Sequence, residues 1–204
     1  MSSETLGAVA RKNASARAVD TFRHRDDAAL PFDSGAAPSI PLLRDMMGYL
    51  DRSAGKLPRS VRELIAARHH LVYHCGVVCA ELAISIGILD PADPRTPDTT
   101  AAIQAHLDHM DKQKSVSPSA AAWTEAALLA GTLARTQGLA IAKKALNPDQ
   151  ECCQRGRRRE LLLDALLYVT AIEQGMLLVS ANVRHMDLLL QIRPSHNLLL
   201  YRPT

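Results

Sequence analysis

Three acidic residues are placed along the chain so that they could act together. Asp45 and Glu81 each follow an apolar segment, and Asp164 lies inside the leucine-rich stretch LLLDALLYVTA. Carboxylates seldom face an apolar interior without a partner. The partner can be an arginine or a helix N-terminus, which would be a structural role. It can also be a divalent cation shared with other acids, which would make a catalytic site.

The elements that must position these acids alternate along the chain. Short apolar or β-branched runs predict strands at residues 40–43, 70–75, 176–180 and 197–201. Helical spacing and end signals predict helices over residues 60–68, 76–86, 99–114 and 118–137, one that bears Asp164 and ends at Gly175, and one over residues 182–191. Strands alternating with helices predict an α/β fold with a parallel sheet, in which ligands gather outside the carboxyl ends of the strands.

Composition favours a single folded domain with an appendage. The chain has 204 residues, of which 47% are hydrophobic, enough for one well-packed core. Residues 1–38 are rich in Ala, Ser, Arg and Asp and lack apolar periodicity, so they are expected to form a disordered N-terminal extension. Residues 39–204 are expected to form the domain.

Charge and cysteine content narrow the functional classes. A net charge of +3 permits contact with nucleic acid without requiring it. The four cysteines do not form the framework of a small secreted domain, and no signal peptide begins the chain, so a reduced, cytoplasmic protein is expected. The apolar runs are much shorter than the roughly 20 residues that span a bilayer, so no membrane partner is expected.

The blocks around the acids resemble the PIN-domain family, ribonucleases best known as toxins of bacterial toxin-antitoxin pairs. The resemblance covers roughly residues 40–203. LLRDMMGYLD places Asp45 and Asp51 at the spacing of the family's first acidic turn, and LVYHCGVVCAEL matches its strand and glutamate-bearing helix. LLLDALLYVTA and then GMLLVSANVRHM match the later aspartate helix, glycine, strand and asparagine segment, and the last block is the most specific.

This resemblance implies a three-layer α/β/α sandwich with a small central, mostly parallel sheet. Asp45, Glu81 and Asp164 would be the catalytic residues and the ligands of Mg²⁺ or Mn²⁺. The implied activity is metal-assisted hydrolysis of RNA phosphodiester bonds, without a covalent enzyme intermediate. The family also implies a homodimer and an antitoxin protein as a partner.

Two departures from the family pattern keep other functions open. Met47 stands where a small polar residue is usual, and His185 occupies the fourth acidic position, with Asp187 two residues further on. Either His185 or Asp187 could complete the metal site. The alternative function is a catalytically degenerate PIN fold that serves as a binding module, and a third is a phospho-acceptor domain using Asp45.

Further residues have both a functional and a structural interpretation. Arg157, Arg158 and Arg159 could bind an RNA backbone, or could be a solvated helix start or a surface for an acidic partner. Asn182 could contact substrate, but asparagine after a strand commonly fixes the turn. The histidines and cysteines over residues 69–79 lack the second ligand pair that a zinc site needs.

Overall fold

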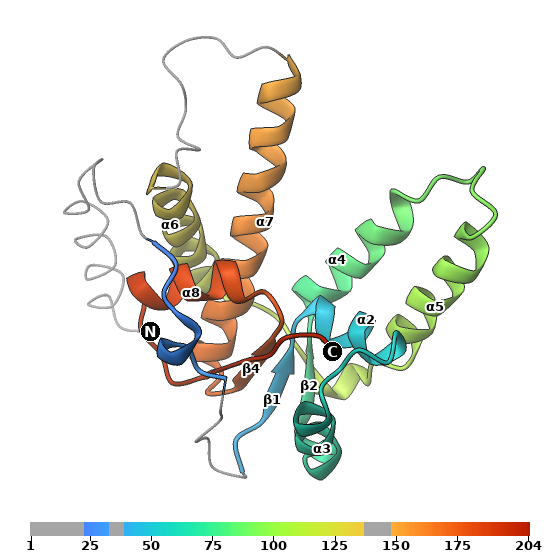
Figure 1. Ribbon diagram of the computed structural model, residues 1–204, viewed down its shortest axis with the longest axis horizontal. Coiled ribbons are helices and arrows are strands. Elements are labelled where there is room, and N and C mark those ends of the chain that lie inside the picture. Colours follow the sequence, from blue (N-terminus) through green and yellow to red (C-terminus); the bar gives the residue numbers. More distant parts are fainter. Residues whose placement is uncertain (1–22, 33–38, 137–147) are drawn as a thin grey trace.

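The centre of the molecule is a parallel sheet. The computed structural model describes residues 23–32, 39–136 and 148–204 (Figure 1). Five strands lie in the order β3-β2-β1-β4-β5, and each neighbouring pair is parallel. The strands are β1 Leu42–Arg44, β2 Val72–Cys75, β3 Ser115–Val116, β4 Leu177–Ser180 and β5 Leu198–Leu200. The predicted α/β class is confirmed, and the architecture is consistent with a PIN-like α/β/α sandwich.

Helices connect the strands and flank the sheet. They are α2 Met46–Ser53, α3 Arg59–Ala67, α4 Gly76–Gly87, α5 Thr96–Asp108, α6 Ala120–Thr136, α7 Pro148–Glu173 and α8 Val183–Ile192, with short 3-10 helices η1 Asp27–Ala29, η2 His69–Leu71 and η3 Lys112–Lys114. Parallel strands need such crossovers, because the chain must return to the same end of the sheet before each new strand. Within the described ranges, no helix is long and apolar enough to cross a membrane.

Two apolar clusters hold the layers together. Leu43 belongs to the larger one, which buries residues of α4, α6, α7 and α8, among them Tyr168. Leu42 belongs to the smaller one, together with Val61 and Ile65 of α3. Successive side chains of a strand point to opposite faces. Both faces of the sheet are therefore covered.

The predicted helix over residues 99–114 is wrong at both ends. It starts earlier, because Pro97 is accommodated in the first turn of α5, and it stops at Asp108. Asp111 then accepts a hydrogen bond from the backbone of Gln113 and starts η3. The end of the predicted helix is therefore a turn and η3, and β3 begins at Ser115, just after it, and pairs with β2.

Two other boundaries also differ. The helix expected from residue 118 begins at Ala120, because Ser119 supplies the capping oxygen to the backbone of Ala122. Helix α2 has no counterpart among the predicted elements. It starts directly after β1, where Asp45 caps it by accepting a hydrogen bond from Gly48.

Residues 23–32 lie against the C-terminal part of the chain, although they fall within the predicted extension. The Arg202 guanidinium forms an ion pair of 2.6 Å with Asp27, and the backbone of Leu200 donates to Pro31. Phe32 is half-buried and packs against the larger core cluster. This part of the predicted extension is therefore held on the domain.

Candidate active site

Asp45 is fixed at the carboxyl end of β1. Its Oδ1 accepts a hydrogen bond from the backbone of Gly48, at 2.8 Å. Its Oδ2 accepts from the Ser180 hydroxyl at 2.5 Å and from the backbone of Ala181 at 3.2 Å. The residue is only 6% exposed. Burial raises the pKa of Asp45 to about 6; these hydrogen bonds oppose the rise and nearby Asp164 adds to it.

Asp164 projects from α7 toward the start of α8. Its Oδ2 accepts a hydrogen bond of 3.0 Å from the Asn182 amide and lies 2.5 Å from Nδ1 of His185. Asn182 also caps α8, because its side-chain oxygen accepts from the backbone of His185. The turn-fixing role expected of Asn182 is thus confirmed, and the same side chain orients Asp164.

Glu81 approaches the same place from α4. Its side chain is half-buried, and burial raises its pKa to about 7, with further contributions from Asp164 and Asp45. Arg159 acts in the opposite direction and favours the charged form. The three acids singled out by sequence therefore lie within electrostatic reach of one another.

The donor chemistry of these acids suits a hard divalent cation, but the side chains are not gathered around one point. Carboxylate oxygens are the ligands that Mg²⁺ and Mn²⁺ prefer, and mutual repulsion would be relieved by a positive ion. Among the side chains that the structure describes, no group of three or more His, Cys, Asp or Glu is arranged to hold a metal. Asp45 and Asp164 instead direct their oxygens to hydrogen-bond donors.

Asp187 has a different set of partners from the other acids. It accepts hydrogen bonds from the Arg25 backbone at 2.8 Å and from the Arg25 guanidinium at 2.6 Å, and Gln191 contacts it as well. Burial alone would raise the pKa of Asp187, but the hydrogen bonds from Arg25 outweigh it and lower the pKa. Its carboxylate ties residues 23–32 to α8, and we do not include it in the acidic site.

The remaining predicted residues are less informative. The side chains of Arg157 and Arg158 lie outside the described part of the chain, and Arg159 is exposed. Met47 is 36% exposed on α2. Among the histidines and cysteines over residues 69–79, His74 binds the Tyr49 hydroxyl and the Cys79 thiol contacts the Met110 sulfur.

Ser180 is a functional candidate that the sequence analysis missed. It closes the apolar run LLVS of β4, and its buried hydroxyl is the shortest hydrogen-bond partner of Asp45. A polar residue at the carboxyl end of a buried strand could have drawn attention to it. Its partner is 135 positions away, however, so only the folded chain reveals the contact.

Fold and site together define an α/β protein with three acids within electrostatic reach of one another near the carboxyl edge of a parallel sheet. No family model and no curated protein matches the sequence. A solved structure of FitAB bound to an IR36 DNA fragment is similar, with a TM-score of 0.43 and 12% sequence identity over 79% of this chain and 94% of that chain. At this TM-score the similarity is no evidence for the family or the function of this chain.

Proposed function

We propose that the chain is a PIN-type endoribonuclease that hydrolyses RNA phosphodiester bonds with Mg²⁺ or Mn²⁺. The observation that carries the proposal is that the turn after β4 binds two of the acids, Asp45 through Ser180 and Ala181 and Asp164 through Asn182. Glu81 lies close enough for both to raise its pKa. Carboxylates in this position repel one another unless a cation neutralises them. The sequence blocks that bear these acids resemble PIN-domain ribonucleases, which supplies the reaction class.

Each residue of the site would have its own role in the reaction. Asp45, Glu81 and Asp164 would hold the cation, which when bound acidifies a water and stabilises charge on the phosphate. Ser180 keeps Asp45 in place, and Asn182 does the same for Asp164. His185, at the Asp164 carboxylate, is suited to contact a substrate phosphate or to transfer a proton.

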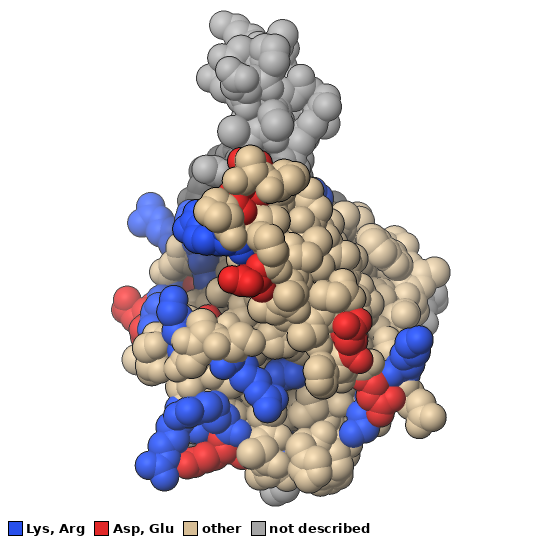
Figure 2. Space-filling model, turned by 90° about the vertical axis from the view of Figure 1, so that its right-hand side faces the viewer, with Lys and Arg blue, Asp and Glu red and all other residues tan. Residues whose placement is uncertain are grey.

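Basic side chains support an RNA substrate. Figure 2 views the side of the molecule on which α4 and α5 lie; many of its Lys and Arg side chains lie toward the left edge, with acidic side chains among them. Arg159 lies close enough to Glu81 to influence it. Such charges bind phosphate groups without regard to sequence. An antitoxin partner and a homodimer belong to the proposal as expectations from the family resemblance.

Cleavage of a fluorogenic RNA tests the proposal. We expect activity with Mn²⁺ or Mg²⁺, loss of activity with a chelator, and a fall of at least ~100-fold in Asp164→Asn, because removing one acid weakens both cation binding and charge stabilisation. Asp93→Asn is the matched control, because the Asp93 carboxylate pairs with nearby Arg95 in an exposed loop. Equal cleavage by wild type and Asp164→Asn would overturn the assignment.

A binding module is the second candidate, and a specific observation favours it. The Asp164 carboxylate is already engaged by His185 and Asn182, and no three-donor group is formed among the described side chains. A module of this kind would keep the fold and the acidic edge without turnover. Absence of both Mn²⁺ binding and RNA cleavage, with RNA binding retained, would favour the module over the enzyme.

A further inference from the structure

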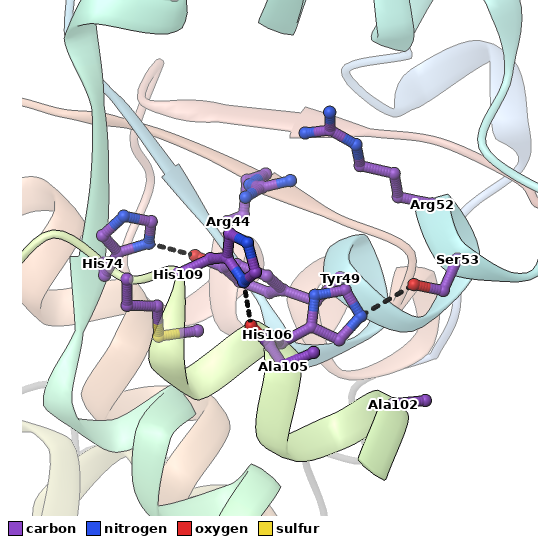
Figure 3. A pocket seen from close by; sticks show the side chains of 10 residues that line it. Arg44, Tyr49, Arg52, Ser53, His74, Ala102, Ala105, His106 and His109 are labelled. Atoms are coloured by element: carbon purple, nitrogen blue, oxygen red, sulfur yellow. Dashed lines mark hydrogen bonds between the residues drawn. The ribbon is translucent and has the colours of Figure 1, made fainter. Parts of the chain in front are cut away.

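A polar cavity lies between α2, α5 and the end of β2. It has a volume of about 540 Å³ and is lined by Arg44, Arg52, His74, His106 and His109, with no acidic residue in its wall. Figure 3 shows these side chains around the space. The volume is in the range of roughly 300–1,000 Å³ that small-ligand pockets occupy. A wall with this composition selects for negative charge.

Arg44 is the unusual member of the wall. It is 6% exposed, and its Nε and Nη1 atoms are buried without a hydrogen-bond partner. Its guanidinium carbon lies 4.0 Å from the centre of the Tyr49 ring, which stabilises the charge but leaves Nε and Nη1 without an acceptor. A buried donor of this kind calls for a missing acceptor such as a water or an anion.

The sheet brings Arg44 and His74 together on one face. Leu42 pairs with Val72 and Leu43 with Tyr73, so the register continues to Arg44 beside His74. Because side chains alternate, these two residues lie on the face of Leu42, whereas Asp45 follows on the other side. None of the three acids lines the cavity, so it is separate from the acidic site, even though Arg44 and Asp45 are adjacent in sequence.

We propose that this cavity binds the phosphate group of a small phosphomonoester, with the Arg44 guanidinium as the central donor. The planar fork of arginine matches two phosphate oxygens, and a doubly charged phosphate interacts with the two arginines of the wall, Arg44 and Arg52, more strongly than a carboxylate does. Arg52 and His109, both exposed, supply the outer wall.

The histidines support the same ligand class. Burial, and then the charge of Arg44, lower the pKa of both His74 and His106. Arg52 and His109 lower the pKa of His106 further. For His74, Lys114 lowers the pKa further and Asp111 raises it. A phosphate at Arg44 would offset the repulsion that these groups impose on one another.

Calorimetric titration of the full chain with inorganic phosphate, AMP and adenosine, at constant chloride, tests the proposal. We expect phosphate and AMP to bind and adenosine not to bind. Arg44→Gln should weaken AMP binding about 10 to 100-fold, since it removes a charged donor. Arg59→Gln, on the exposed Arg59–Glu63 pair of α3, should leave it unchanged.

A second variant covers the case in which Arg44→Gln does not fold. His106→Ala alters a half-buried side chain at the opposite wall, where His106 contacts the Ser53 hydroxyl at 2.8 Å, and should weaken AMP binding several-fold. No binding of phosphate or AMP by wild type, equal binding of adenosine and AMP, or wild-type affinity in the folded variants would overturn the proposal. RNA cleavage is a separate readout, so either proposal can fail without the other.

Discussion

At the scale of single residues, Asp45 shows burial and hydrogen bonding in opposition. Three donors stabilise its carboxylate, yet its pKa still rises to about 6 because the group is removed from water. A bound cation would stabilise the charged form of Asp45 further and lower its pKa. In the metal-free protein, the charged forms of Asp45 and Glu81 are therefore less stable in the folded chain than in the unfolded one.

The raised pKa values predict how stability depends on pH. Between about pH 4 and 7 these two carboxyl groups bind more protons in the folded state than in the unfolded state, so the stability that they contribute is greatest at the low end and is lost as pH rises. We expect urea unfolding of metal-free protein to show a loss on the order of 1–3 kcal/mol across this window. Asp45→Asn should flatten the loss, and an unchanged slope in that variant would refute the assigned pKa.

The pKa of Asp187 is lowered, whereas those of Asp45 and Glu81 are raised. Its bonds to Arg25 stabilise the charged form, so Asp187→Asn should lower the free energy of unfolding by about 1–3 kcal/mol near neutral pH. The variant should leave Mn²⁺ affinity unchanged, because this carboxylate is not part of the acidic site. A loss of Mn²⁺ binding comparable to that of Asp164→Asn would return Asp187 to the list of ligands.

At the scale of elements, the segment over residues 23–32 behaves as part of the domain. Phe32 packs on the core and lies beneath the Arg202 guanidinium, 5.5 Å from the ring centre. We expect Phe32→Ala to lower stability by about 1–2 kcal/mol, less than for a fully buried phenylalanine. Thermal and urea unfolding would measure it. No change would mean that the segment is not docked in solution.

Element types were easier to predict from sequence than their limits. Long helices and the buried strands β2 and β4 follow from apolar spacing, which is a local property. Strand β3 is only two residues long and exists because it pairs with β2, so its own sequence gives no signal. Strand order depends on contacts between distant segments, which one sequence does not reveal.

At the scale of the whole molecule, the sheet brings together residues that are far apart in the chain. The three acids could be selected in advance because each stands beside a recognisable apolar block. Ser180 and Arg44 could not, since their importance comes from a long-range hydrogen bond in one case and from two buried guanidinium nitrogens without a hydrogen-bond partner in the other. The parallel fold thus places an acidic edge and a basic cavity on either side of one strand end.

Calorimetry with Mn²⁺ tests the acidic site most directly. Wild type and four variants would be titrated near neutral pH, with Asp45→Asn, Glu81→Gln and Asp164→Asn as the site variants and Asp93→Asn as the surface control. We expect wild type and the control to bind Mn²⁺ equally, and each site variant to bind at least ~10-fold more weakly. Failure of wild type to bind Mn²⁺, or equal binding by all variants, would contradict a shared metal site at Asp45, Glu81 and Asp164.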